Sequence, residues 1–554
     1  MYREKYILIG IILLAIFLRI IALDQFPPSL FADEVDAGYQ AYSILKTGRD
    51  INANFMPASF ESFSDFRTPL YIYSIVPLIS IFGLNEWSVR LPAATFGILS
   101  VVGIYFLAKH LEFNSMVRIS AAFLLAISPW HLHYSRAAFE ATLMLAIILW
   151  ALVFFFKGQK KRIYFFVSAA LFPLSIYSYS TAKLFIPLLL LGLIIIYRST
   201  FKKLTFKFNL FLVTIAIVIS LPFISDLISG HAGYRFSYTS IFADPIVSKE
   251  VDFSRQVDGI ENGNLTVGST PSLISKLSHN KILSFSDTFV KNYLSPFSST
   301  FLFLNGDYIG RHSVGKMGEL YLVEVISIIF GLLWLTRTRL FQSRKILLLW
   351  LAIAPIPAAL TVEGATHSTR LFILIAPLVL ISSLGLDLFL KNFWTTTIKK
   401  VIFAGFVFLF CLNIYNYFHR YYIHYPKEQE RLWHYGFKQA ILKAEAESDK
   451  YEKIVFTPTT EPSLIFLLFW TKFDPKVFQD MDFDPNNPKL GKYSIESVEP
   501  PSIDNTAIAS KTLAVTNQKD LGLDLRYKKI PGVKVIDIIT YPSGDAAFYL
   551  ITHE

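Results

Sequence analysis

The sequence predicts a polytopic α-helical membrane protein with about 11 transmembrane helices, further juxtamembrane helices and a small C-terminal extracytoplasmic α/β domain. Of the 554 residues, 53% are hydrophobic and only 17% are charged, whereas soluble domains carry about 25% charged residues. The mean hydropathy is +0.45, and the net charge of +10 comes from short basic clusters between apolar runs. Such clusters are typical of cytoplasmic loops rather than of nucleic-acid binding. The single cysteine, Cys411, excludes a disulfide framework.

Eleven apolar runs are predicted to cross the bilayer, whose hydrocarbon core is about 30 Å thick. In chain order they are Tyr6–Leu23, Leu91–Ala108, Ile119–Trp130, Phe139–Phe156, Ile163–Tyr179, Leu184–Tyr197, Phe208–Ile224, Leu320–Leu335, Ile346–Val362, Leu371–Leu390 and Val401–Tyr417. No small-residue cleavage site follows the first run, so we interpret it as a retained span rather than a signal peptide.

Charge predicts the orientation. Four segments each carry three or four Lys or Arg and no acid, and are expected in the cytoplasm: residues 157–162, 198–207, 337–345 and 391–400. All four lie on the same side as the N-terminus if Pro69–Gly83 does not span but forms a juxtamembrane or re-entrant helix. The predicted localisation is therefore the plasma (inner) membrane, with the N-terminus cytoplasmic and the C-terminal domain outside.

This topology divides the chain into a transmembrane domain, residues 1–420, and an extracytoplasmic domain, residues 421–554. The transmembrane domain has a first outer loop at 24–90 and a long outer loop at 226–319, in which Leu273–Tyr293 is expected to form one or two amphipathic helices. In the tail, the pattern predicts a helix over Glu428–Ser448, a buried helix face at Leu464–Trp470, and strands at 453–457, 534–539 and 547–551.

The first outer loop carries a dense group of acids. Asp33, Glu34 and Asp36 lie within four residues shortly after the first span, and Arg67 and Arg90 follow near the end of the loop. Acids in an outer loop are usually only solvated. The neighbouring cations favour a catalytic role for Asp33 and Glu34.

Further basic residues stand singly at predicted outer ends of spans, against the usual charge bias. They are Arg136, Lys183, Arg235, Arg311 and Arg370. Each alone commonly snorkels to the interface. Together they predict a membrane-anchored anion, because guanidinium groups bind phosphate well.

Several other polar residues have two open interpretations. Glu140 is either an i,i+4 ion-pair partner of Arg136 or a second active-site acid. His131 and His133 are two residues apart, which points them to different helix faces and disfavours a metal site. Asp307, His312 and His367 lie in predicted outer loops, where a structural role and a substrate-binding role are equally open.

Several motifs together resemble the C-type membrane glycosyltransferases, namely the protein O-mannosyltransferases and the lipid A aminoarabinose transferases (glycosyltransferase family 39-like). They are Asp33-Glu34, Phe66-Arg-Thr-Pro-Leu70, Trp87-Ser-Val-Arg-Leu-Pro92, Ser128–Arg136 with Glu140, Asn305–His312 and His367-Ser-Thr-Arg370. The resemblance covers about residues 5–420, and its specificity comes from the order of the motifs along the chain.

The resemblance implies transfer of a sugar from a polyprenyl-phosphate donor to an acceptor hydroxyl of a protein, lipid or cell-wall glycan on the outer face. Asp33 would be the base of a single inverting displacement, with Glu34 as its partner and Glu140 as a less secure acid. Arg67 and Arg90 match phosphate-contacting or essential cations of the family. Substrate-binding candidates by position are Arg136, Lys183, Arg311, His312, His367 and Arg370.

No metal or other cofactor is required if arginines hold the departing phosphate, although a divalent ion at Asp33, Glu34 or Glu140 stays open. Three alternatives remain: a polytopic transporter, a non-catalytic glycolipid-binding protein, and a ligase for lipid-linked oligosaccharides. Transporters place ionisable groups near mid-membrane, whereas the unusual charges here gather at predicted outer ends of spans.

Overall fold

The computed structural model is mainly helical and forms two compact units. It describes residues 2–62, 65–261, 270–338, 340–393, 396–458, 463–481, 483–484, 488–496 and 511–553. Unit 1 comprises Met1–Ala15, Phe96–Tyr134 and Phe139–Ile414, and unit 2 comprises Ile16–Thr95, Ser135–Ala138 and Tyr415–Glu554. The units do not follow the predicted domain boundary at residue 420, because the first loop groups with the C-terminal residues.

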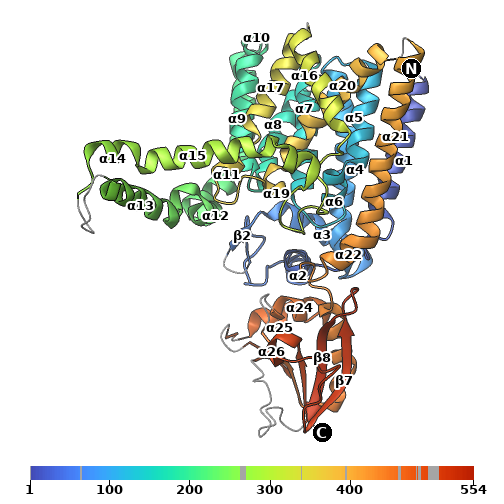
Figure 1. Cartoon of the computed structure of the whole chain (residues 1–554), viewed down its shortest axis with the longest axis vertical. Helices are drawn as coiled ribbons and strands as arrows, with labels where there is room; N and C mark the ends of the chain where they lie inside the picture. The colour runs from blue at the N-terminus through green and yellow to red at the C-terminus, as the bar shows by residue number, and fades with distance from the viewer. Residues whose placement is uncertain are drawn as a thin grey trace. The chain divides into compact units, whose positions relative to one another are not determined.

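Unit 1 is a helical bundle (Figure 1). Its helices are α5 (Ser115–Ile127), α6 (Pro129–Tyr134), α7 (Ala141–Gly158), α8 (Tyr164–Leu174), α9 (Ala182–Ile196), α10 (Arg198–Lys202), α11 (Phe206–Ile228), α16 (Glu324–Arg337), α17 (Phe341–Ile353), α18 (Ile356–Ala359), α19 (Ser368–Leu371) and α20 (Ile375–Phe393). Three long helices have residues in both units: α1 (Tyr2–Ile20), α4 (Glu86–His110) and α21 (Thr397–His419).

Every predicted apolar run overlaps at least one helix, but Ile119–Trp130 is divided between α5 and α6, and Ile346–Val362 between α17 and α18. Among the described residues, five helices are long and apolar enough to cross a membrane: Glu86–His110, Ala141–Gly158, Phe206–Ile228, Ser368–Phe393 and Thr397–Glu428. The chain is thus a multi-helix membrane protein by length and composition, while the count of about 11 spans stays a prediction.

The long loop of unit 1 contains a helical arm that extends sideways from the bundle (Figure 1). It consists of α12 (His231–Thr239), α13 (Pro245–Glu261), α14 (Leu273–Ser278) and α15 (Lys281–Leu294). The segment expected to hold one or two amphipathic helices therefore holds two, α14 and α15. Asn280 separates them, and its side chain caps α15 by accepting a hydrogen bond from the backbone of Leu283.

In unit 2, the first loop folds into α2 (Ala32–Thr47), a hairpin of β1 (Phe60–Ser62) and β2 (Asp65–Arg67), and α3 (Pro69–Phe82). The hairpin pairs Phe60 with Arg67 and thereby fixes the position of this arginine. The segment Pro69–Gly83, predicted to be a juxtamembrane helix, is α3. It starts with Pro69 at a favoured first position and ends at Gly83, whose φ is 75°.

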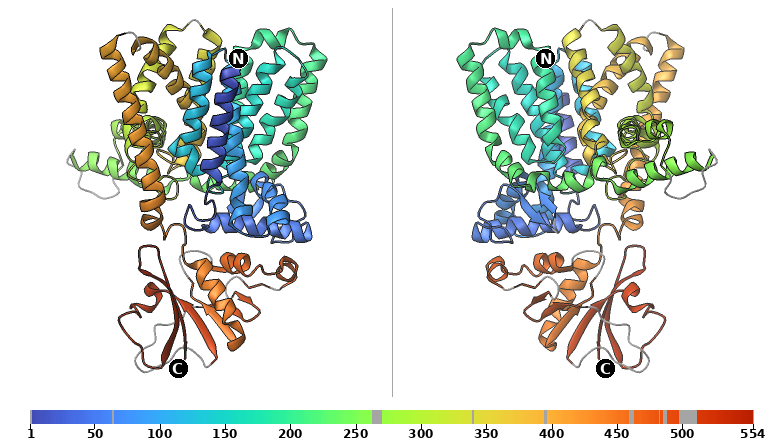
Figure 2. Two further views of the ribbon diagram at one scale, coloured as in Figure 1. Left: turned by 90° about the vertical axis from the view of Figure 1, so that its right-hand side faces the viewer. Right: turned by 90° about the vertical axis from the view of Figure 1, so that its left-hand side faces the viewer.

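The C-terminal part of unit 2 contains a six-stranded mixed sheet of order β4-β5-β3-β6-β8-β7 (Figure 2). The strands are β3 (Lys453–Phe456), β4 (Lys489–Leu490), β5 (Tyr493–Ile495), β6 (Thr512–Thr516), β7 (Val533–Thr540) and β8 (Ala546–His553). The three strands predicted from alternating hydrophobicity correspond to β3, β7 and β8. The short strands β4 and β5 and the strand β6 were not predicted.

The predicted helix over Glu428–Ser448 is wrong in its first half. The structure has a short α22 (Tyr425–Glu428), then turns, and only then α23 (Phe437–Ala446). The break occurs where His434 has a φ of 50° and Gly436 a φ of 100°. Glycine favours this left-handed conformation, which ends a regular helix.

Two C-terminal helices pack on α2 of the first loop. They are α24 (Ser463–Trp470), which is the predicted buried apolar helix, and α25 (Pro475–Asp480). The Tyr39 hydroxyl donates to the carbonyl of Phe473 at 2.9 Å, and the Gln479 amide donates to the carbonyl of Asp50 at 2.7 Å. These bonds join chain segments more than 400 residues apart into one unit.

Close packing of α16 on α20 depends on glycine. A Cβ built on Gly385 would lie 1.6 Å from the carbonyl oxygen of Ser327, and one built on Gly331 would lie 2.0 Å from that of Ile381. Backbone atoms cannot move aside cheaply, so the two helices touch only because both side chains are absent.

We therefore expect Gly385→Ala to lower the thermal unfolding temperature of the purified protein in detergent. Overpacking of this kind typically costs about 1–3 kcal/mol. The matched control is Gly405→Ala, because nothing lies within 4 Å of a Cβ at that position. Equal melting temperatures for both variants would contradict the packing argument.

Candidate active site

Asp33 lies in the first turn of α2 and forms an ion pair with the arginine at the end of the β1–β2 hairpin. Arg67 Nη2 is 2.6 Å from Asp33 Oδ1, and Arg67 Nε is 3.0 Å from Asp36 Oδ2. The Asp33 side chain is 54% exposed, whereas the Asp36 side chain is 1% exposed. Arg67 therefore bridges one exposed and one buried carboxylate.

Asp36 was noted in the sequence but was not predicted as a site residue. Its spacing from Asp33, i and i+3, places both acids on one face of a helix and was the available signal. Burial raises the pKa of Asp36 to about 6, and the charge of Arg67 opposes this rise. Asp36 also lines a cavity of about 420 Å³ together with Ser62, Asn52 and Gln479.

Glu34 and Arg90 form a fully buried ion pair. Arg90 Nε donates to Glu34 Oε1 and Arg90 Nη2 to Glu34 Oε2, both at 2.9 Å. Both side chains are 0% exposed. The rest of the guanidinium donates to the carbonyls of Leu23, Pro27 and Ser29. Glu34 also accepts a bond from the backbone of Ala138 at 2.8 Å.

Arg136 is held in a similar way. Its guanidinium donates to the carbonyls of Leu18, Ile21, Ala22 and Phe26 at 2.7–3.1 Å, and its side chain is 0% exposed. The Leu18 carbonyl belongs to the last turn of α1, where backbone oxygens lack helical partners, and the other three follow the helix. Arg136 therefore caps α1.

The burial of these three residues changes the interpretation of the predicted site. Arg90 and Arg136 were predicted to bind substrate, and Glu34 was predicted to be catalytic. None of them exposes any side-chain surface in this structure. Their bonds hold the segment between α1 and α2 and thereby fix the backbone position of Asp33. Their roles in catalysis and substrate binding stay predictions.

The remaining predicted acid, Glu140, precedes α7 and is half-buried. The predicted i,i+4 partner Arg136 donates to the carbonyls described above. His133 Nε2 lies 2.7 Å from the carbonyl oxygen of Arg311, and His131 stacks on Phe372. The catalytic role of Glu140 and the substrate role of Arg311 stay predictions.

Unit 1 contains a cationic cavity of about 450 Å³. Lys183, Arg235 and Arg370 line it together with the apolar side chains of Phe223, Leu227, Phe236 and Leu360. Lys183 Nζ donates to the carbonyl of Ala232 at 2.9 Å, and Arg370 Nη1 donates to the Thr361 hydroxyl at 2.7 Å. Two of the predicted substrate-binding residues, Lys183 and Arg370, thus line one cavity, with Arg235 as a third cation.

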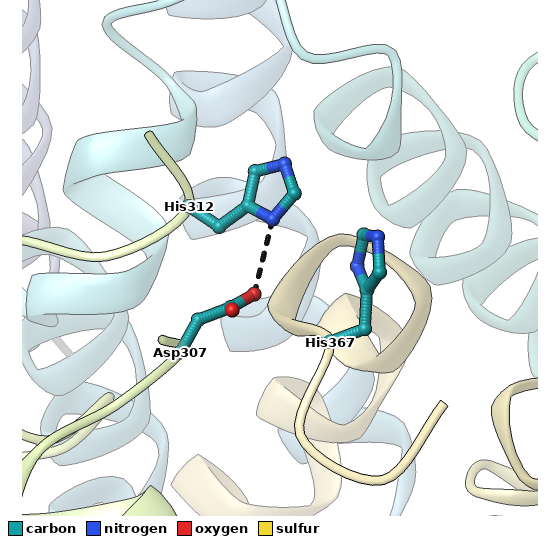
Figure 3. Close-up of side chains that lie close together, drawn as sticks. All are labelled: Asp307, His312 and His367. Carbon is teal, nitrogen blue, oxygen red and sulfur yellow. Dashed lines mark hydrogen bonds and ion pairs between the residues drawn. The ribbon is translucent and has the colours of Figure 1, made fainter. Parts of the chain in front are cut away.

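A second polar cluster in unit 1 joins Asp307, His312 and His367 (Figure 3). His312 Nδ1 lies 3.0 Å from Asp307 Oδ2, and the rings of His312 and His367 are 4.7 Å apart. Burial and the charge of Arg370 lower the pKa of His367 well below its usual value, so its ring is neutral. The two histidines were predicted as substrate-binding residues, but their proximity to Asp307 was not predicted.

The comparisons with known proteins agree with the resemblance seen in the motifs. A family model described as dolichyl-phosphate-mannose-protein mannosyltransferase matches residues 67–225. The chain is also 31% identical over 157 residues to YkcB of Bacillus subtilis (strain 168), a protein named provisionally as a mannosyltransferase. That match covers 27% of this chain and 22% of YkcB, so the chain spans less than a quarter of this relative.

The fold is similar to that of a solved transferase. The oligosaccharyltransferase of Archaeoglobus fulgidus, crystallised with a tethered acceptor peptide, aligns with 99% of this chain and 74% of its own at a TM-score of 0.51 and 14% identity. Its complex with Zn and sulfate aligns with 98% of this chain and 72% of its own at a TM-score of 0.50 and 15% identity. These similarities support the C-type membrane glycosyltransferase fold that the motifs predicted.

We expect the two adjacent acids to respond differently to loss of charge. Glu34→Gln leaves the guanidinium of Arg90 buried without its counter-ion and should lower the free energy of unfolding by about 3–5 kcal/mol. Asp33→Asn removes one partner of a partly exposed pair and should change the free energy of unfolding by less than about 1 kcal/mol. Thermal unfolding of both variants in detergent measures the difference, and equal losses would contradict the assignment.

The raised pKa of Asp36 predicts a pH dependence of stability. Because the folded state favours the protonated carboxyl, the free energy of unfolding should fall as pH rises from about 4 to about 6. The expected loss over this window is on the order of 3 kcal/mol, since a shift of one pKa unit corresponds to about 1.4 kcal/mol.

The test of this pH dependence compares denaturant unfolding of wild type and Asp36→Asn between pH 4 and pH 7. Asp36→Asn should lack this pH-dependent loss. Its free energy of unfolding should therefore rise relative to that of wild type as the pH increases. Asp65→Asn removes the same charge from the neighbouring β1–β2 hairpin and serves as the control. Parallel curves for wild type and Asp36→Asn would refute the prediction.

Proposed function

We propose that this protein transfers a sugar from a polyprenyl-phosphate carrier to an acceptor hydroxyl, with Asp33 as the catalytic base. The observation that supports this most strongly is the division between Asp33 and Glu34. Glu34 is fully buried in its pair with Arg90, whereas Asp33 projects with 54% of its side chain exposed beside Arg67. The match of residues 67–225 to a mannosyltransferase family model supports sugar transfer as the reaction class.

In the proposed reaction, Asp33 takes the proton of the acceptor hydroxyl while the acceptor oxygen attacks the anomeric carbon of the sugar. The bond between that carbon and the phosphate oxygen breaks, and its electron pair leaves with the polyprenyl phosphate. One displacement inverts the anomeric centre, so a single base is enough. Double displacement, in contrast, needs a second carboxylate as nucleophile.

We assign the carrier phosphate to the cationic cavity of unit 1. Three cations, Lys183, Arg235 and Arg370, line one side-chain cavity whose other walls are largely apolar. Charge on the leaving phosphate grows during transfer, and cations fixed beside the phosphate stabilise that charge. A phosphate attached to an isoprenoid chain meets both requirements of this cavity. In this proposal the cations take the place of a metal at the phosphate.

The orientation of the chain belongs to the same proposal. The basic clusters and the N-terminus would be cytoplasmic, and the first loop and the C-terminal sheet would lie outside, where lipid-linked sugars are used. The donor is proposed to carry a single hexose or pentose. A lipid-linked oligosaccharide is the second candidate, because the similar fold with a TM-score of 0.51 belongs to an oligosaccharyltransferase.

The decisive experiment compares cells that lack the gene with cells that express wild type, Asp33→Asn or Asp449→Asn. Mass spectrometry of lipids, proteins and cell-wall polymers identifies the transferred unit and its acceptor. Loss of a base typically slows such reactions by about 10²–10⁴-fold. Asp33→Asn should therefore lose the product and accumulate the lipid-linked donor, while Asp449→Asn should match wild type.

The same experiment can refute the proposal. Wild-type levels of product in the Asp33→Asn strain, at equal protein abundance, would remove the base assignment. An unchanged envelope in cells that lack the gene would remove the transferase assignment. A transferred unit of several sugars would select the oligosaccharide donor over the monosaccharide donor.

A further inference from the structure

The cluster of Asp307, His312 and His367 in unit 1 has no part in the reaction proposed above. Asp307 and His312 belong to the loop between the π-helical turn at Thr300–Leu304 and α16, and His367 directly precedes α19. Each residue offers one ligand atom, and these atoms all lie within 4.8 Å of one another. Two segments about 55 residues apart in sequence are thereby brought together.

The carboxylate of this cluster is held in place before any ligand arrives. Asp307 accepts hydrogen bonds from the backbone of Ile309 at 2.9 Å and from the backbone of Ser368 at 2.8 Å. Its own backbone N–H donates to Glu319 at 3.2 Å. Outer bonds of this kind orient metal ligands in known sites, where their loss commonly reduces affinity by 10–100-fold.

His367 supplies the strongest indication of a missing ligand. Its side chain is 7% exposed, and its Nδ1 atom has no hydrogen-bond partner within the described residues. A buried polar atom without a partner is unfavourable by about 1–3 kcal/mol. The ring stands beside that of His312, with centroids 4.7 Å apart (Figure 3).

We propose that Asp307, His312 and His367 bind one divalent zinc ion. Two imidazole nitrogens and one carboxylate oxygen form a donor set that Zn²⁺ accepts, with a fourth position left open to water or to a substrate oxygen. Magnesium and calcium prefer all-oxygen sets and fit poorly here. The hydrogen bond between His312 Nδ1 and Asp307 Oδ2 is the contact that a metal ion would replace.

Modest rotation of the rings is enough to form the site. Zinc bonds of about 2.0–2.1 Å place tetrahedral ligand atoms roughly 3.4 Å apart. The His312–Asp307 pair already lies at 3.0 Å. The ligand atom of His367 lies within 4.8 Å of the other two ligand atoms. Movement of the His367 ring toward His312 and Asp307 shortens these distances.

The ion would fasten the loop after the π-helical turn to the start of α19. Glu319 already contributes to this junction, because the Ser368 hydroxyl donates to its carboxylate. Arg370 lies three residues beyond His367 and lines the cationic cavity. The metal ion would therefore position one wall of that cavity. Binding of the ion does not depend on which sugar donor the protein uses.

Two other His–Asp pairs of unit 1 provide matched controls. His279 Nε2 is 3.3 Å from Asp258 Oδ2, and His231 Nδ1 is 3.4 Å from Asp226 Oδ1. Both histidines are at least 36% exposed. A His–Asp contact alone is thus present elsewhere, and what distinguishes the proposed site is the buried second histidine.

The test uses the full chain purified in detergent, stripped with chelator and dialysed against zinc chloride or cobalt chloride. Elemental analysis gives the metal bound per chain, and the visible spectrum of bound Co²⁺ reports nitrogen ligands in a distorted tetrahedron. Wild type and His279→Ala should bind one equivalent. His367→Gln and His312→Gln, which keep a polar group of similar size, should lose at least about tenfold in affinity.

Thermal unfolding gives a second measurement that is independent of enzymatic activity. Added zinc should raise the melting temperature of wild type and His279→Ala, but not that of His367→Gln. Wild-type protein that binds no zinc, or His367→Gln and His312→Gln variants that bind it as tightly as His279→Ala, would overturn the proposal. If a variant fails to fold, zinc binding by the wild-type protein still tests the proposal.

Discussion

The buried pair of Glu34 and Arg90 is the interaction on which the rest of the candidate site depends. Two opposite charges with 0% exposure are stable only because every remaining donor of the guanidinium meets a carbonyl and the carboxylate accepts a further backbone bond. These bonds determine where α2 begins. The exposed acid, one residue earlier, is held in position because its neighbour is fixed.

This constraint explains how one dipeptide can carry two roles. Asp33 and Glu34 are adjacent, but on a helix they point about 100° apart. Glu34 faces Arg90, while Asp33 faces Arg67 at the end of the β1–β2 hairpin. The helices α24 and α25 of the C-terminal part pack on the same α2. That part of the chain therefore supports the helix that carries the acid, which gives the tail a physical reason to be present.

The sequence predicted best what depends on local pattern. Apolar runs marked the helices because hydropathy is a local property, and alternation marked β3, β7 and β8. The sequence could not show which cations were buried, because Arg90, Arg136 and Arg370 look alike as isolated charges at predicted outer ends of spans. It also could not show that Asp307 meets His367, because the two residues are 60 positions apart and the intervening residues carry no signal of that contact. The helix predicted over Glu428–Ser448 failed for a local reason, the left-handed backbone at His434 and Gly436.

One physical criterion then distinguishes charges that are fully used inside the protein from charges that are available to a ligand. A charged group whose hydrogen-bonding capacity is consumed inside the protein has little left for a substrate, and this describes Glu34 and Arg90. Asp33 retains an exposed carboxylate, and Lys183 and Arg370 line a cavity. His367 is buried and retains a ring nitrogen without a partner among the described residues. Because burying such a nitrogen is unfavourable, its presence beside a second histidine and an oriented carboxylate is explained most simply by a ligand that the three residues share.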